Sequence, residues 1–150
     1  FSILKRANVT MFATAFYGII DLNELSMEYS CAGHPGPVVI GEKSSHQICT
    51  GRGGKGPALG LMNQQTYPIH TLDLTDVQRL LLFTDGVLEA ENEEGEQFMD
   101  QRLLKIASEN PHKDIEDWLE SIIETVLDFS DSHHFDDDVC VLGLHIVKPS

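Results

Sequence analysis

Two aspartates, each next to a run of apolar residues, stand out as groups that could do chemistry. The first lies in residues 79–90, RLLLFTDGVLEA, where the apolar run stops at Thr84, Asp85 and Gly86. Apolar runs of this length that end in a turn signal are typical of a strand buried on both faces. A carboxylate at the end of such a strand has a defined position, and its burial is costly unless a positive group meets it.

The second aspartate lies near the C-terminus. Residues 135–138, FDDD, lead directly into an apolar and β-branched run at 139–147, which predicts another strand. Adjacent carboxylates repel one another, and this raises their pKa values unless a cation is present. If the two strands are neighbours, Asp85 and Asp137 could converge on one point, where oxygen ligands would suit Mg²⁺ or Mn²⁺ better than zinc. The alternative is that these acids are solvated turn residues.

Size, charge and cysteine content restrict the class of protein. A chain of 150 residues with 41% hydrophobic residues is sized for one domain with a real core. The net charge of −14 argues against binding to nucleic acid or to an anionic membrane surface, and no apolar run approaches a membrane span. Cys31, Cys49 and Cys140 lack CxxC spacing, which favours buried thiols in a reducing cytoplasm over disulfides or a zinc site. Because the chain starts at Phe1 without a leader pattern, we expect a piece of a longer polypeptide.

The elements expected around these acids are strands first, then two helices, then a final strand. Strands are predicted at residues 11–20, 26–31, 38–40, 46–50, 65–74 and 79–84, and residues 2–8 have the pattern of a frayed helix end. The first two strands should form a hairpin, and the first four suggest one meandering antiparallel sheet. This order predicts an α+β fold in which helices pack on a mainly antiparallel sheet.

Two helices are predicted between the last two strands. Met99, Leu103, Ile106 and Ala107 have helical spacing, which predicts the first helix. Residues 110–111, Asn-Pro, should open a longer helix, with the Asn as its cap. An apolar stripe continues through residues 115–127, as expected for packing against a sheet with Trp118 as an anchor.

The glycine-rich segment at residues 51–60, GRGGKGPALG, could be mistaken for a phosphate-binding loop. It lacks the GxxxxGK[ST] register, and no helix pattern follows it. We therefore expect a mobile surface loop near the functional site rather than a nucleotide-binding loop.

With these residues in view, the chain resembles the metal-dependent (PPM) serine/threonine protein phosphatases, and most of all their bacterial SpoIIE- and RsbU-type branch. The matching segments run in order through most of the chain: FATAFYG at 12–18, AGHPGP at 32–37, GPALG at 56–60, LFTDGVLEA at 82–90 and DDV at 137–139. The resemblance implies a PPM-like α+β fold, with antiparallel sheet layers flanked by antiparallel helices. Residues 1–150 would form a single domain, an incomplete β-sandwich equivalent to the C-terminal two-thirds of a phosphatase domain.

The resemblance also implies the site. It makes Asp85 and Asp137 the catalytic ligands of a binuclear Mn²⁺ or Mg²⁺ centre, with Asp138 beside them as a further metal residue. His34 lies where eukaryotic relatives place an acid near another metal, although plain turn packing would also explain it. In the family an earlier aspartate bridges both ions, and nothing in residues 1–10 matches that segment. We therefore expect this chain alone to be inactive or nearly so.

The leading hypothesis is a phosphatase that uses a metal-activated water. Its substrate would be phosphoserine or phosphothreonine on a bacterial regulatory protein of the anti-sigma-factor-antagonist type, in the cytoplasm, downstream of a sensor or receiver domain. The alternative is a catalytically degenerate phosphatase fold that acts as an adaptor for a signalling partner. Because strand edges pair readily, we also hypothesise that the chain forms a homodimer.

Overall fold

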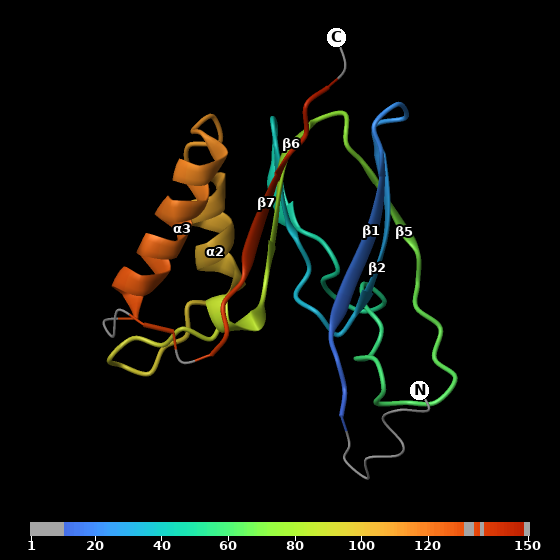
Figure 1. Ribbon diagram of the computed structural model, residues 1–150, viewed down its shortest axis with the longest axis horizontal. Helices are drawn as coiled ribbons and strands as arrows, with labels where there is room; N and C mark the ends of the chain where they lie inside the picture. The colour runs from blue at the N-terminus through green and yellow to red at the C-terminus, as the bar shows by residue number, and fades with distance from the viewer. Residues whose placement is uncertain (1–10, 131–133, 136, 149–150) are drawn as a thin grey trace.

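The computed structural model describes residues 11–130, 134–135 and 137–148. The helix predicted at residues 2–8 and the first acid of the FDDD segment, Asp136, lie outside the described residues. The elements form three layers: a three-stranded sheet, a four-stranded sheet and a pair of helices (Figure 1).

The three-stranded sheet has the order β1-β2-β5, with both pairs antiparallel. Its strands are β1 (Ala15–Asp21), β2 (Ser26–Ala32) and β5 (His70–Asp73). The predicted hairpin is confirmed, because β1 and β2 pair along their whole length from Ala15 with Ala32 to Asp21 with Ser26. Strand β1 begins later than predicted, and β5 is shorter than predicted.

The four-stranded sheet has the order β4-β3-β6-β7, again with antiparallel pairs. Its strands are β3 (Val38–Gly41), β4 (Ser45–Gln47), β6 (Val77–Phe83) and β7 (Val141–His145). The prediction of one meandering sheet is therefore wrong, since the first four strands divide between two sheets. The change of sheet occurs in the Gly- and Pro-rich segment at 33–37. A Cβ at Gly36 would lie 1.8 Å from the carbonyl oxygen of Ile48, so only glycine allows the chain to pass there.

The helices are α2 (Met99–Ser108) and α3 (Ile115–Phe129), and they cover the face of the four-stranded sheet that points away from the other sheet (Figure 1). The predicted apolar stripe is confirmed, because Trp118, Ile122 and Val126 are buried. No helix in the described part of the chain is long and apolar enough to cross a membrane.

The predicted start of the second helix is wrong. Asn110 has a φ of 54°, in the left-handed region, and therefore cannot serve as an N-cap, which needs extended backbone. Asp114 takes that role instead, because its carboxylate accepts a hydrogen bond of 3.0 Å from the backbone N–H of Glu116. The Asn-Pro pair lies in the turn between the two helices.

Strand β6 belongs to two cores at once. Leu80 points into the core between the two sheets, and Leu81 points into the core between the sheet and the helices. The prediction of a strand buried on both faces is thereby confirmed. Buried thiols are confirmed for Cys31 and Cys49 but not for Cys140, which is exposed because it lies just before an edge strand.

Candidate functional site

Pairing of β6 with β7 brings the two acidic turns to the same end of one sheet. The strands are antiparallel neighbours, and Phe83 at the end of β6 lies opposite Val141 at the start of β7. Asp85 is separated from β6 by Thr84 alone and begins a short 3-10 helix, η1 (Asp85–Val87). Asp137 and Asp138 precede β7 by a few residues. The condition for the two acids to approach one another, that their strands are neighbours, is therefore met.

Thr84 links the two turns. Its hydroxyl donates a hydrogen bond of 3.0 Å to the carbonyl of Asp138 and accepts one of 2.9 Å from the backbone N–H of Cys140. Its own backbone N–H donates to the carbonyl of Cys140 at 3.0 Å. A Cβ at Gly86 would lie 2.9 Å from the same Asp138 carbonyl, so a larger residue there would push the turns apart. Sequence analysis missed this role of Thr84; its only signal is a hydroxyl residue directly before the aspartate.

The three predicted acids do not all face one cavity. Asp85 lines a cavity of about 390 Å³, and Asp137 lines a neighbouring one of about 390 Å³. All three side chains are exposed, and one carboxylate oxygen of Asp137 accepts a hydrogen bond of 2.7 Å from the backbone N–H of Asp138. Within the described residues, no three His, Cys, Asp or Glu side chains form a group that could hold a metal ion. Asp85, Asp137 and Asp138 therefore stay predicted ligands.

The glycine-rich loop forms one wall of the Asp85 cavity and therefore lies near this predicted site residue. Its Gly56 accepts a hydrogen bond of 2.9 Å from the backbone N–H of Gly33 and donates one of 2.9 Å to the carbonyl of Cys31. Lys55 of this loop lines the same cavity as Asp85. Sequence analysis did not single out this lysine, because the glycines around it carry no register that predicts its direction.

His34 lies where the first sheet, the glycine-rich loop and the end of β6 meet. Its Nδ1 is 3.0 Å from the hydroxyl of Thr14. Burial lowers the pKa of His34 below its ordinary value; the charge of Asp85 opposes this effect, and that of Lys55 adds to it. Its carbonyl accepts a hydrogen bond of 3.1 Å from the thiol of Cys31, which supports the turn-packing role.

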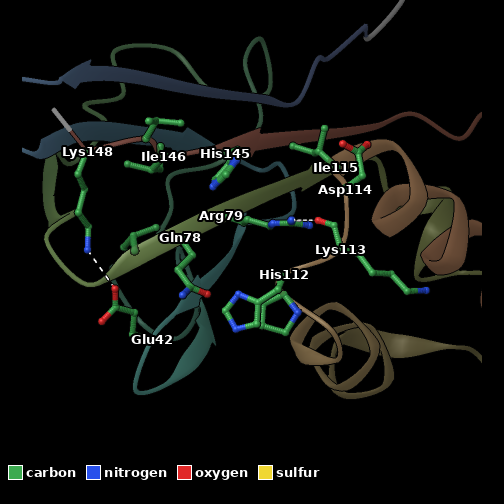
Figure 2. Close-up of a pocket in the computed structure, with 13 residues that line it drawn as sticks. Glu42, Gln78, Arg79, His112, Lys113, Asp114, Ile115, His145, Ile146 and Lys148 are labelled. Carbon is green, nitrogen blue, oxygen red and sulfur yellow. Dashed lines mark hydrogen bonds and ion pairs between the residues drawn. The ribbon is translucent and has the colours of Figure 1, made fainter. Parts of the chain in front are cut away.

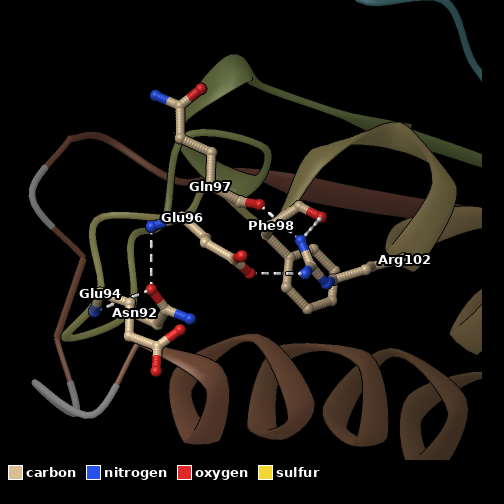
Figure 3. A network of polar contacts seen from close by, with 6 residues as sticks. All are labelled: Asn92, Glu94, Glu96, Gln97, Phe98 and Arg102. Carbon is tan, nitrogen blue, oxygen red and sulfur yellow. Dashed lines mark hydrogen bonds and ion pairs between the residues drawn. The ribbon is translucent and has the colours of Figure 1, made fainter.

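The segment after η1 forms an acidic loop that borders the Asp137 cavity through Glu91 and Gln97. Most of this loop is exposed, although Ala90 is buried. Figure 3 shows how it is held: the side-chain oxygen of Asn92 accepts two backbone hydrogen bonds, and Arg102 of α2 contacts the loop. Arg102 forms an ion pair of 3.0 Å with Glu96 and donates a hydrogen bond of 2.7 Å to the carbonyl of Gln97.

Comparison with known proteins agrees with this arrangement. The family model described as stage II sporulation protein E (SpoIIE) matches residues 2–147. The chain belongs to the SpoIIE family. The resemblance inferred from the five segments is therefore confirmed.

Two curated relatives are longer than the region they share with this SpoIIE-family chain. Protein IcfG of Synechocystis is 34% identical over 108 residues, which cover 71% of this chain and 16% of IcfG. Phosphoserine phosphatase RsbP of Bacillus subtilis is 28% identical over 131 residues, which cover 87% of this chain and 30% of RsbP. The chain thus spans less than a third of either relative.

Solved structures confirm the α+β PPM-like fold. The RsbU and RsbW domains of Rv1364c from Mycobacterium tuberculosis match with a TM-score of 0.75 at 22% identity, over 99% of this chain and 40% of that one. The phosphatase domain of the cell fate determinant SpoIIE from Bacillus subtilis matches with a TM-score of 0.70 at 16% identity, over 99% of this chain and 64% of that one. At these identities the likeness concerns the fold alone.

Proposed function

We propose that the protein containing this chain is a metal-dependent phosphatase that hydrolyses phosphoserine or phosphothreonine on a regulatory protein. The observation that carries the proposal is the Thr84 link, which holds the Asp85 turn beside the turn of Asp137 and Asp138. Membership of the SpoIIE family supports it.

The three acids are of the chemical type, carboxylates, that binds hard divalent cations. Asp85 and Asp137 would hold Mn²⁺ or Mg²⁺, with Asp138 beside them, because carboxylate oxygens are the ligands these ions prefer. When bound, such ions lower the pKa of a coordinated water and neutralise charge on phosphoryl oxygens. Three acids are few for a pair of ions, so we expect this chain by itself to bind Mn²⁺ weakly and to be inactive or nearly so.

The residues around Asp85 would receive the phosphorylated side chain. Lys55 lines the Asp85 cavity and supplies a cation that can bind phosphoryl oxygens. The nearby backbone is dense in glycine, which lets a substrate approach the chain closely. The acidic loop beside Asp137 would repel a phosphate, and this favours entry from the Lys55 side.

The names of two relatives support the proposed substrate class. RsbP is named a phosphoserine phosphatase, and the Rv1364c structure contains RsbU and RsbW domains. We infer that this protein acts in the bacterial cytoplasm on a phosphorylated anti-sigma-factor antagonist, under the control of an upstream sensor or receiver domain.

The test is phosphate release by the full protein from a phosphorylated antagonist and from a small phosphoester, with and without Mn²⁺. We expect Mn²⁺-dependent hydrolysis that falls at least a hundredfold in Asp85→Asn and Asp137→Asn, or roughly 2.7 kcal/mol of transition-state stabilisation. Asp128→Asn, an exposed acid on α3, is the control and should keep full activity. Binding of the antagonist without hydrolysis under any metal condition would instead establish the adaptor function.

We also propose that the chain pairs with a second copy through β1. Among the described strands β1 pairs only with β2, and none of them pairs with its other edge. On its outer face Tyr17 and Ile19 are 67% and 55% exposed. Open, apolar edge strands favour pairing with another chain. Light scattering should give a dimer mass for the native chain and a monomer mass for Ile19→Lys; a monomer at high concentration for both would refute this pairing.

A further inference from the structure

A buried arginine lies at the opposite end of β6 from the acidic turn. Arg79 is only 3% exposed, and its Nε and Nη1 have no hydrogen-bond partner among the described residues. Its Nη2 donates a hydrogen bond to the carbonyl of Lys113, and its guanidinium lies 5.0 Å from the ring centre of Trp118. A buried cation is costly where no protein group replaces the hydrogen bonds that its nitrogens made to water in the unfolded chain. Although the charge of Asp114 acts on Arg79, two of its nitrogens remain available to a further anionic partner.

Arg79 lines a cavity of about 660 Å³ between the sheet and the start of α3 (Figure 2). His145 of β7 is the direct cross-strand partner of Arg79, so the two side chains share the face that turns toward the helices. His112 and Lys113 line the cavity from the turn before α3, and Lys148 lines it from the segment after β7.

The cavity is locally cationic in a strongly acidic chain. Its lining contains three permanent cations, Arg79, Lys113 and Lys148, against two carboxylates. One of these, Glu42, pairs with Lys148 at 3.2 Å, and the other, Asp114, accepts a hydrogen bond from the backbone at the start of α3. The Glu42–Lys148 pair balances its own charge, and the charge of Asp114 acts on Arg79, but no described carboxylate hydrogen-bonds Nε or Nη1 of the guanidinium.

This cavity is separate from the candidate phosphatase site. Arg79 lies four residues before Phe83, the last residue of β6, which corresponds to about 13 Å of strand, and Asp85 lies beyond that end. Neither Asp85 nor Asp137 lines the Arg79 cavity. A ligand held here would not touch the proposed metal ligands, so the inference does not rest on the proposed function.

We propose that the Arg79 cavity is a second ligand site that binds a small phosphate-bearing anion. The guanidinium presents paired N–H groups that match two oxygens of a phosphate, and this geometry is the reason arginine recognises such groups. Lys148 and the imidazole of His145 are the other polar groups that would surround the anion. The two unpaired nitrogens are shielded from bulk water, so the anion reaches them only after a side chain of the cavity lining is displaced. Bound phosphate supplies the hydrogen bonds that the guanidinium lacks.

The single tryptophan provides the measurement, because Trp118 lies against the Arg79 guanidinium. Inorganic phosphate is titrated into the full chain with EDTA present, in an Asp85→Asn background that disables the predicted metal site. We expect a saturable change in Trp118 fluorescence at constant ionic strength, and no such change with chloride. A response to chloride equal to the response to phosphate would show a general salt effect and overturn the proposal.

Variants locate the site. Arg79→Met should abolish the saturable response, and Arg102→Met is the matched control, since its guanidinium lies over Phe129, 4.8 Å from the ring centre. Because Arg79→Met can also weaken folding, the exposed Lys148→Met and His145→Gln are tested in parallel and should each weaken phosphate binding by about threefold to tenfold. Unchanged binding in both exposed variants, or no saturable binding by the native chain, would refute the site. Loss of phosphatase activity by the Asp85→Asn variant of the full protein, with phosphate binding retained, would show that the two sites are separate.

Discussion

The hydroxyl of Thr84 donates a hydrogen bond of 3.0 Å to the backbone carbonyl of Asp138, although the two residues are 54 positions apart in the sequence. This contact fixes the backbone of one acidic turn relative to the other. The carboxylates themselves are exposed, so their placement depends on the turns that carry them rather than on packing of their side chains. The effects of substitutions near the site should follow from this dependence.

Replacement of Thr84 by valine removes the hydroxyl at nearly constant volume. The Asp138 carbonyl and the Cys140 N–H each lose a hydrogen bond, so we expect unfolding to become easier by about 1–3 kcal/mol. Mn²⁺ affinity of the full protein should fall as well, since the turns separate. Denaturant titration and calorimetric metal titration measure the two effects. Thr125→Val, which removes a hydroxyl contact within α3, should leave metal affinity unchanged.

The pKa of His34 should lie below its ordinary value of 6.5 in the metal-free protein, chiefly because of burial. At a pH between the pKa of His34 in the folded chain and its higher pKa in the unfolded chain, only the unfolded chain binds the proton. Stability should therefore fall as the pH drops through 6.5 and level off below the folded pKa. Asp85→Asn should lower the pKa of His34 further, since the Asp85 charge raises it. An NMR titration measures the pKa of His34 in the native chain and in Asp85→Asn. A higher His34 pKa in Asp85→Asn would contradict the placement of His34 beside Asp85.

The three cysteines should differ sharply in reactivity. Burial, together with the neighbouring Cys31, raises the pKa of the Cys49 thiol to about 12, so the reactive thiolate is scarce at neutral pH. Cys140 is exposed. A thiol reagent should modify Cys140 quickly in the native chain and the other two only after unfolding. Cys140→Ser should remove the fast phase; a fast phase that survives this substitution would show that a buried thiol is accessible.

Trp118 should be the most costly single residue to remove from the helical layer. It is fully buried, and its indole N–H donates a hydrogen bond of 3.0 Å to the carbonyl of Ala107 in α2. We expect Trp118→Ala to lower the free energy of unfolding by about 3–5 kcal/mol, measured by circular dichroism in urea. Leu142→Ala, at a 52% exposed position, should cost far less. Equal losses would mean that Trp118 does not anchor the layer.

Much of the fold could be predicted from local patterns. The alternation in residues 26–31 and the helical spacing in residues 115–127 each encode one buried face, and both segments have the predicted structure. Helix boundaries were less predictable, since Asn110 and Asp114 are both acceptable cap residues. Only the backbone conformation, left-handed at Asn110, decides between them.

The sequence by itself determined that a buried strand ends at Asp85 and that acids precede the last strand, because burial and turn formation depend on neighbouring residues. Five short segments were also sufficient to indicate the SpoIIE family. Only the tertiary structure decided that the first four strands divide between two sheets, that Thr84 ties the acidic turns together and that Arg79 is buried with unpaired nitrogens. Each of these facts is a contact between distant parts of the chain, and local propensity carries no information about which distant groups will meet.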